Sequence, residues 1–159
     1  MKYSFQKRIR LKDFSYKGLW RYFVTISTYE GKRYFENTKC VESCIIYLKD
    51  LSVSYNFNVL AYCFMPDHLH LLIEGKEEDS DFRKFISMFK QKINYHFKNI
   101  EGNPLWQKDY YEHVLRRDEN TIQVIKYILD NPVRKGMVKD FRDYPFLDFF
   151  VYNLREMFT

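Results

Sequence analysis

The sequence predicts an α+β fold in which an antiparallel sheet carries two helices on one face and leaves its other face open. Short segments rich in aromatic and β-branched residues alternate with segments whose apolar residues recur at helical spacing. The expected order is β-α-β-β-α-β followed by one further helix, which is the ferredoxin-like (RRM-like) arrangement. The 159 residues contain no internal repeat and no low-complexity linker, so we expect a single domain over residues 1–159.

The composition is that of a folded, basic protein. Hydrophobic residues make up 46% of the chain and charged residues 30%, which is typical of a globular domain rather than a disordered segment. The formal net charge of +5 favours a polyanionic partner. Aromatic residues reach 19%, which fits either an aromatic core or surfaces on which nucleic-acid bases stack.

The expected location is the cytoplasm, with no association with a membrane. No apolar run approaches the roughly 18–20 residues that span a bilayer, and no secretory leader is recognisable near the N-terminus. The three cysteines are an odd number, and we interpret them as small buried residues in a reducing compartment.

The first half of the chain predicts a strand, a helix and a hairpin. Aromatic and β-branched residues over 19–28 predict the first strand. Apolar residues at helical spacing predict a helix over 38–55. Residues 57–64 predict a second strand, and the turn at Pro66 and Asp67 leads directly into a third strand, so the two strands should form an antiparallel hairpin.

The second half predicts two more helices with an extended segment between them. An acidic segment precedes the helix expected up to residue 98, and residues 105–117 predict a fourth strand or an extended arm. The third helix is expected over 121–131, where a proline ends it. Residues 140–159 are rich in aromatic side chains and should pack back on the core. Helix caps are expected at Asn37 or Thr38, within residues 77–81, and at Asp118 or Asn120.

Two histidines stand out on the third strand. Residues two apart in a strand point to the same face, so His68 and His70 lie side by side while Leu69 and Leu71 point the other way. Adjacent imidazoles can bind one metal ion, because neutral histidine is the commonest protein metal ligand. The alternative is two polar residues on the wet face of a half-buried strand.

The third helix brings two further candidates. Tyr127 and Asn131 are four residues apart and therefore neighbours on one helix face, whereas the apolar stripe of this helix lies elsewhere. Over the open sheet face, Asn131 would offer an amide oxygen to a metal held by His68 and His70, and Tyr127 would lie nearby. The alternative for Tyr127 is a residue at the edge of the core.

These parts suit phosphodiester cleavage by a tyrosine nucleophile. A free phenol has a pKa near ~10 and is a weak nucleophile at neutral pH, so the phosphate must be activated. A divalent ion can bind and orient the phosphate and stabilise the charge that develops on its oxygens. Magnesium prefers oxygen ligands and manganese accepts imidazole more readily, so the expected cofactor is Mg²⁺ or Mn²⁺.

Three motifs, in this order and spacing, resemble those of the small single-tyrosine HUH transposases, and in particular the branch called REP-associated tyrosine transposases. They are Phe64–Ile73, with the two histidines; Leu105–His113; and Tyr127–Gly136. The resemblance runs from about residue 8 to residue 140. It implies a ferredoxin-like fold and a metal-dependent endonuclease that cleaves and rejoins single-stranded DNA near hairpins.

The resemblance also implies roles for individual residues. Tyr127 would be the catalytic nucleophile, forming a 5′-phosphotyrosine link and freeing a 3′-hydroxyl, while His68 and His70 would be the metal pair. Insertion-sequence relatives have a glutamine as third ligand, and this sequence has Asn131 at that place. The partner would be single-stranded DNA with a hairpin, from repeats or insertion-sequence ends, and the protein would act as a monomer or a homodimer.

Basic residues are the candidates for holding the DNA. Residues 1–21 carry seven Lys and Arg side chains against the single acid Asp13, which fits either a solvated face or a phosphate-binding segment. The candidate DNA-binding residues are Arg8, Arg10, Lys12, Arg116, Arg117, Arg134 and Lys135.

Two other functions remain open at this point. A basic domain of this topology could bind hairpin DNA or RNA without cleaving it, with bases stacked on sheet aromatics. A metal-dependent hydrolase would use water as the nucleophile and would form no covalent link between protein and DNA.

Overall fold

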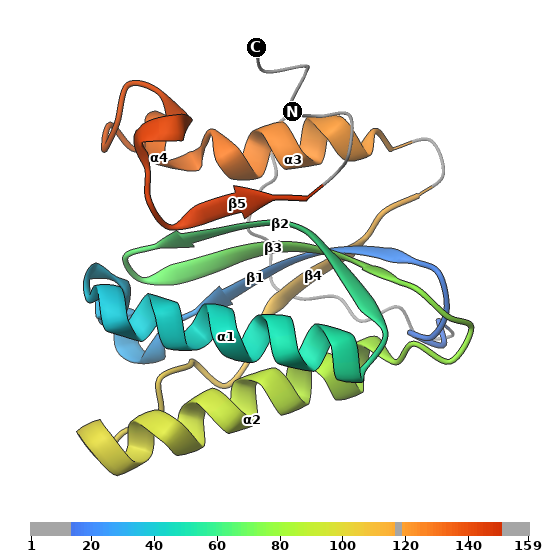
Figure 1. The fold of residues 1–159 in the computed structure, drawn as a ribbon, viewed down its shortest axis with the longest axis horizontal. Coiled ribbons are helices and arrows are strands. Elements are labelled where there is room, and N and C mark those ends of the chain that lie inside the picture. Colours follow the sequence, from blue (N-terminus) through green and yellow to red (C-terminus); the bar gives the residue numbers. More distant parts are fainter. Residues whose placement is uncertain (1–13, 117–118, 151–159) are drawn as a thin grey trace.

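The computed structural model describes residues 14–116 and 119–150, which form one five-stranded sheet with helices on both faces (Figure 1). The strand order is β4-β1-β3-β2-β5, and every neighbouring pair is antiparallel. The predicted α+β fold with an antiparallel sheet is therefore confirmed. The strands are β1 (Arg21–Ser27), β2 (Phe57–Met65), β3 (His68–Gly75), β4 (Tyr111–Val114) and β5 (Leu147–Phe149).

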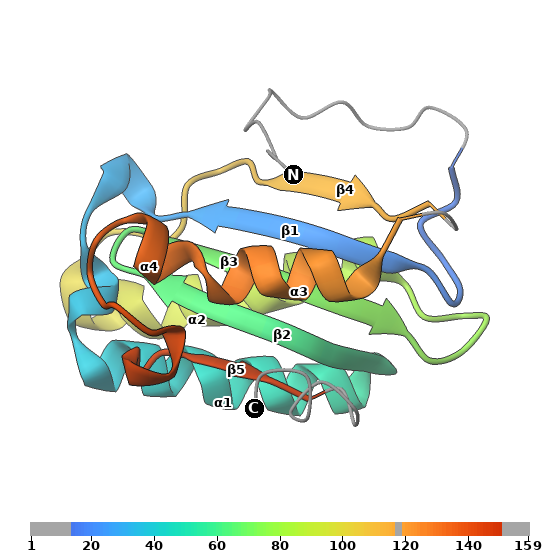
Figure 2. The same cartoon turned by 90° about the horizontal axis from the view of Figure 1, so that it is seen from above.

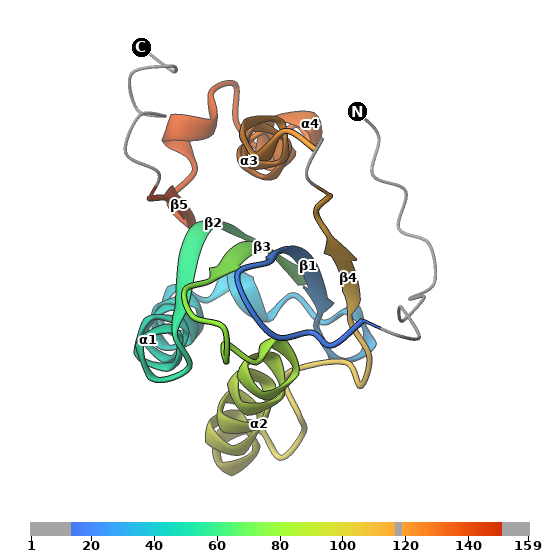
Figure 3. The ribbon, with the colours of Figure 1, turned by 90° about the vertical axis from the view of Figure 1, so that its right-hand side faces the viewer.

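The helices divide between the two faces of the sheet. Seen end-on, α1 and α2 lie on one face and α3 on the other (Figure 3), and from above α3 runs over the central strands (Figure 2). Within the described residues no helix is both long enough and apolar enough to cross a membrane. The helices are α1 (Thr38–Ser54), α2 (Phe82–Glu101), α3 (Thr121–Leu129) and α4 (Asn131–Arg134), with short 3₁₀ turns at Tyr29–Gly31, Tyr34–Glu36 and Phe141–Asp143.

The long helices begin at polar caps. The side chains of Asn37, Asp81 and Asn120 each accept a hydrogen bond from a backbone N–H in the first turn of α1, α2 and α3. These bonds satisfy N–H groups that have no partner within the helix. Gly102 ends α2 with a φ of 76°, a conformation that glycine adopts without a steric penalty. The predicted starts of all three helices are confirmed.

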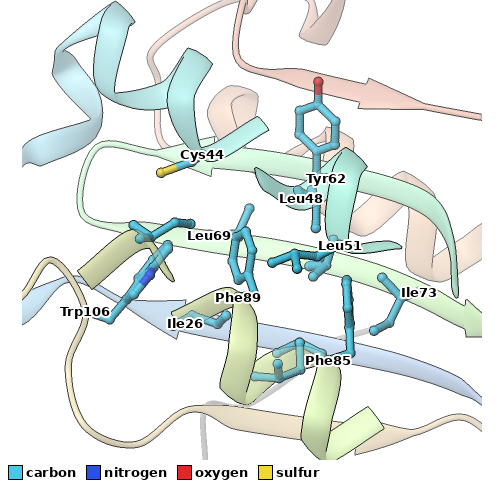
Figure 4. Packing of buried hydrophobic residues seen from close by; sticks show 14 of the residues in the cluster. Ile26, Cys44, Leu48, Leu51, Tyr62, Leu69, Ile73, Phe85, Phe89 and Trp106 are labelled. Carbon is cyan, nitrogen blue, oxygen red and sulfur yellow. The ribbon is translucent and has the colours of Figure 1, made fainter. Parts of the chain in front are cut away.

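The main core lies between the sheet and the pair α1 and α2. Alternate residues of β3, Leu69, Leu71 and Ile73, point into it and are fully buried. Figure 4 shows Leu48 of α1 and Phe89 of α2 packed in the same layer. The residues between them in β3 point to the α3 face, so the pleat of one strand separates a purely apolar side from a side that can carry polar groups.

The fourth strand is shorter than the predicted range 105–117. Only Tyr111–Val114 pairs continuously with β1, and Trp106 forms an isolated bridge to Thr28. The buried side chain of Lys90 accounts for the gap, because its Nζ donates to the carbonyl oxygens of Gln107 and Lys108 at 2.8 and 2.7 Å. Those carbonyls therefore face α2 instead of joining the ladder.

The C-terminal segment packs on the sheet, as predicted, but it does so through a strand that the sequence pattern did not predict. Strand β5 pairs with the outer edge of β2. The hydroxyl of Tyr144 donates to the backbone oxygen of Phe64, which ties the segment to β2. Residues 151–159 lie outside the described part of the chain.

Candidate active site between the sheet and helix α3

The two predicted histidines lie side by side on the α3 face of β3. The Pro66-Asp67 turn closes the β2–β3 hairpin, and His68 is the first residue of β3. His70 pairs with Thr25 of β1, and its side chain is only 1% exposed. A buried imidazole surrounded by strands on both sides is held in place more firmly than a ligand on a loop.

The outer nitrogen of each ring has a hydrogen-bond partner. Nδ1 of His70 lies 2.9 Å from Oγ1 of Thr25, and Nδ1 of His68 lies 2.7 Å from Oδ1 of Asp67. A carboxylate only accepts, so Nδ1 of His68 carries a proton, and the lone pair of the neutral ring is then at Nε2. Such partners fix the tautomer and orientation of metal-binding histidines.

The inner nitrogens of the two rings face each other. Nε2 of His68 and Nε2 of His70 are 3.2 Å apart. When His70 also donates from Nδ1, to the Thr25 hydroxyl, two lone pairs meet at this distance, and a shared cation removes their repulsion. Two nitrogens at this separation can both lie about 2.1 Å from one ion, a usual length for a bond from imidazole to a divalent metal. The residues therefore fit a divalent ion.

The electrostatic surroundings keep His70 in the form that binds metals. Its burial, and then the positive charges of Arg134, Lys135 and a protonated His68, lower the pKa of His70 well below its ordinary value. His70 is therefore a neutral imidazole at neutral pH, and neutral imidazole is the ligand form.

Asn131 lies beside the imidazole pair. Its Nδ2 is 3.5 Å from Nε2 of His68, and the residue is only 4% exposed. A half-turn of the amide would place its oxygen against the imidazoles. Within the described residues no group of three His, Cys, Asp or Glu side chains lies together, so two imidazoles and one amide are the metal-binding groups that this site offers.

Asn131 does not belong to the same helix as Tyr127, which corrects the prediction of one helix over 121–131. Helix α3 ends at Leu129, and Asn131 opens the short helix α4. Pro132 has no N–H with which to continue the helical ladder, and this accounts for the break. The backbone of Asp130 stays in the right-handed helical region, with φ −79° and ψ −6°. The chain therefore keeps turning, and Asn131 still reaches the sheet.

Tyr127 projects from α3 toward the histidines. The centre of its ring lies 6.4 Å from the centre of the His70 ring and 6.0 Å from that of Phe23, which it meets edge to face. The guanidinium of Arg134 lies over the ring, with Cζ 4.0 Å from its centre. The structure thus brings together His68, His70, Asn131, Tyr127 and Arg134.

The predicted DNA-binding residues fall into three groups. Arg134 and Lys135 follow α3 and lie close enough to the site to affect the pKa of His70. Arg116 follows β4 and lines a separate cavity of about 530 Å³ together with Trp20 and Arg21. The structure does not describe Arg8, Arg10, Lys12 and Arg117.

Sequence reasoning missed two residues of the site. Asp67 had a local signal, since it directly precedes His68. Thr25 had none, because only the register of β1 against β3 places it beside His70. The remaining histidines have other partners. His113 pairs with Glu119 at 2.8 Å, and the ring of His96 packs against Tyr47 and Phe97.

Comparisons with known proteins place the chain in a family. The family described as "Transposase IS200 like" matches residues 15–131. An Escherichia coli K12 protein named REP-associated tyrosine transposase is 32% identical over 95 residues, which cover 58% of this chain and 54% of that protein. A Haemophilus influenzae protein with a provisional name of the same kind is 28% identical over 149 residues, or 87% of this chain and 83% of that protein.

A solved structure shares the fold. The structure of a REP-associated tyrosine transposase bound to a REP hairpin superimposes with a TM-score of 0.71 and 24% identity, covering 87% of this chain and 81% of that one. The family match spans most of the chain, from the residues before β1 to the start of α4. The protein therefore belongs to the IS200-like transposase family, and it is an enzyme of the tyrosine transposase class, which carries out transesterification on DNA.

Proposed function

We propose that this protein, as a single HUH-type domain, cleaves and rejoins single-stranded DNA near hairpins through a 5′-phosphotyrosine intermediate. The observation that carries the proposal is the position of the Tyr127 ring, 6.4 Å between centres from a buried imidazole whose partner imidazole lies beside it. The solved relative bound to a REP hairpin supports a hairpin as the recognised feature of the substrate.

His68, His70 and Asn131 would hold one divalent ion, Mg²⁺ or Mn²⁺, and they are all neutral ligands. When bound, such an ion orients the phosphate and stabilises the charge on its oxygens. Asp67 and Thr25 would orient the two imidazoles through their bonds to the Nδ1 atoms, and when Thr25 accepts from His70 each ring has its lone pair at Nε2.

Tyr127 supplies the nucleophile. Its hydroxyl oxygen forms a bond to phosphorus, and the bond between phosphorus and the 3′-oxygen of the preceding nucleotide breaks. The proton lost by the phenol is balanced by the proton that the 3′-oxygen gains as it becomes a hydroxyl. Rejoining reverses these steps with a 3′-hydroxyl as the attacking group, so no nucleotide cofactor is needed.

The basic residues would hold the hairpin and the strand that leads to Tyr127. Arg134 and Lys135 lie beside the site, and Arg116 lies beyond the other end of α3. Each phosphate contact releases counterions, so hairpin affinity should fall steeply as the salt concentration rises. An affinity that does not depend on salt would count against these residues.

A cleavage assay tests the proposal. Hairpin-bearing single-stranded DNA is incubated with Mn²⁺, and covalent adducts are separated on a denaturing gel. Wild type should form an adduct and Tyr127→Phe should form none. Tyr95→Phe, on the outer side of α2 and 71% exposed, is the matched control and should behave as wild type.

The alternatives give different results in the same assay. Cleavage without an adduct, surviving in Tyr127→Phe, would mean that water is the nucleophile and the protein is a hydrolase. Hairpin binding with no cleavage by wild type, in Mg²⁺ or Mn²⁺, would leave only a binding module.

A further inference from the structure

The guanidinium of Arg134 stacks on the ring of Tyr127, the proposed nucleophile. The guanidinium carbon lies 4.0 Å from the centre of the Tyr127 ring, closer than the 4.4 Å between Arg83 and Tyr16 on the other side of the sheet. A guanidinium at this distance stacks on an aromatic face, with both an electrostatic and a packing component. The ring of Phe23 also contacts the Tyr127 ring, edge to face.

The same guanidinium also reaches the polypeptide on either side of the helix break. Its Nη1 lies 3.4 Å from Oδ2 of Asp130, and its Nη2 lies 3.5 Å from Oδ1 of Asn131. Asn131 in turn faces His68 through the other end of its amide. One planar group thus connects the ring of Tyr127 to the amide that adjoins the imidazole pair.

The position of Arg134 in the chain makes this connection useful. Helix α3 ends at Leu129, so the backbone of α3 alone does not fix Asn131 relative to Tyr127. The side chain of Arg134 contacts both the Tyr127 ring and the carboxylate of Asp130, and so ties the ring to the turn that follows α3. A lysine could supply charge here, as Lys135 does, but it lacks the planar fork that can stack on a ring and donate from two nitrogens at once.

We propose that Arg134 is a positioning residue, which holds the Tyr127 phenol in place for attack on the phosphate. This inference rests on the proposed function. The side chain of Arg134 is 36% exposed, so part of the guanidinium remains accessible at the edge of the site. Correct placement of a nucleophile contributes to the rate of reaction and much less to the binding of the rest of the substrate.

The test measures two quantities, the rate of adduct formation at saturating protein and the hairpin affinity. Arg134→Gln should slow adduct formation about 100-fold, the usual effect of losing one group that organises a transition state, while hairpin affinity falls less than about fivefold. Arg134→Lys keeps the charge and should still lose about tenfold in rate. Arg83→Gln removes a comparable stacked arginine from the other face of the sheet and should leave both quantities unchanged.

A chemical rescue distinguishes positioning from a general loss of structure. Arg134→Ala leaves a gap beside the Tyr127 ring, and millimolar guanidinium should restore part of its rate without changing wild type. Thermal unfolding confirms that each variant is folded. If Arg134→Gln is not folded, the lysine variant and the rescue decide the question alone.

Three outcomes would overturn the inference. They are a rate for Arg134→Gln within threefold of wild type, a loss of affinity as large as the loss of rate, and a lysine variant as fast as wild type. Failure of the proposed function looks different, since wild type itself would then form no adduct, or Tyr127→Phe would form one.

Discussion

The two faces of the sheet are built from the same strands but carry different side chains. On the α1 and α2 face, β3 contributes Leu69, Leu71 and Ile73 to a continuous apolar core. On the α3 face, the alternate residues of β3 include His68 and His70, with Thr25 of β1 alongside His70. His70 is as well buried as its apolar neighbours, although it is polar.

This difference shows how the fold separates stability from chemistry. Burying a polar group is costly unless each of its polar atoms has a partner. The α3 face buries the polar imidazole pair, whose inner nitrogens lie 3.2 Å apart. The α1 and α2 face supplies the compensating burial through its larger apolar core, and the buried Lys90 on that side has two backbone carbonyls as partners. Substitutions on the two faces should therefore affect different measurements.

The largest effect is expected from removing an imidazole. His70→Ala should lower the rate of DNA cleavage by about 10³-fold or more, because the site loses a group that would bind the phosphate-activating ion. Hairpin affinity should stay close to that of wild type. The melting temperature should fall too little to account for the loss of cleavage. Equal losses of cleavage and hairpin affinity would show instead that His70 is structural. Both faces of the sheet would then serve stability.

The second largest effect is expected on the opposite face. Phe89 of α2 is fully buried and packs against Trp106. Phe89→Ala should lower the free energy of unfolding by about 3–5 kcal/mol, through lost burial and the cavity that remains. Denaturant unfolding measures this change, and Tyr95→Ala, at an exposed position of the same helix, should change it by less than about 0.5 kcal/mol. Cleavage per folded molecule should be unaffected.

Much of this organisation could be predicted from the sequence, because local rules govern it. Alternation along β3 assigned Leu69 and His70 to opposite faces, and polar residues before apolar stripes gave the helix starts. Pro132 predicts the end of the third helix at Asn131, but α3 ends two residues earlier, at Leu129, and Asn131 begins the short helix α4. The expected third helix nevertheless placed Tyr127 and Asn131 on the sheet.

Features that depend on pairing between distant segments could not be predicted. Thr25 reaches His70 only through the register of two strands 45 residues apart. Lys90 shortens β4 by taking two carbonyls from a loop 17 and 18 residues further along the chain. The stacking of Arg134 on Tyr127 likewise depends on the direction that α4 takes after α3 ends. The spacing of apolar residues along the sequence does not predict that direction.

A smaller effect is expected from the second layer of the α3 face. Thr25→Val keeps the shape of the side chain but removes the hydroxyl that lies 2.9 Å from Nδ1 of His70. Affinity for Mn²⁺, measured by calorimetry, should fall about 10–100-fold, as is usual when the partner of a metal-binding histidine is lost. Thr25→Ser retains the hydroxyl and should remain near wild type. An unchanged affinity in Thr25→Val would mean that packing alone orients His70.

The smallest effect is expected at Tyr144, which lies on the α3 face but takes no part in the proposed chemistry. Its hydroxyl donates to the backbone oxygen of Phe64, so Tyr144→Phe should lower the free energy of unfolding by about 1 kcal/mol at pH 7. Burial raises the pKa of this phenol above its ordinary value of 10.0. Above pH ~10 the phenol ionises more readily in the unfolded chain, so wild type loses stability there.

The phenylalanine variant lacks this ionisation, and the difference between the two proteins should therefore shrink between pH 7 and pH ~11. Urea unfolding at several pH values measures the difference, with the exposed Tyr95→Phe as a control whose difference from wild type stays constant. Cleavage per folded molecule should not change in Tyr144→Phe. A loss of cleavage there would mean that the polar site extends along the α3 face as far as the C-terminal segment, instead of being confined to the imidazole pair and the residues that contact it.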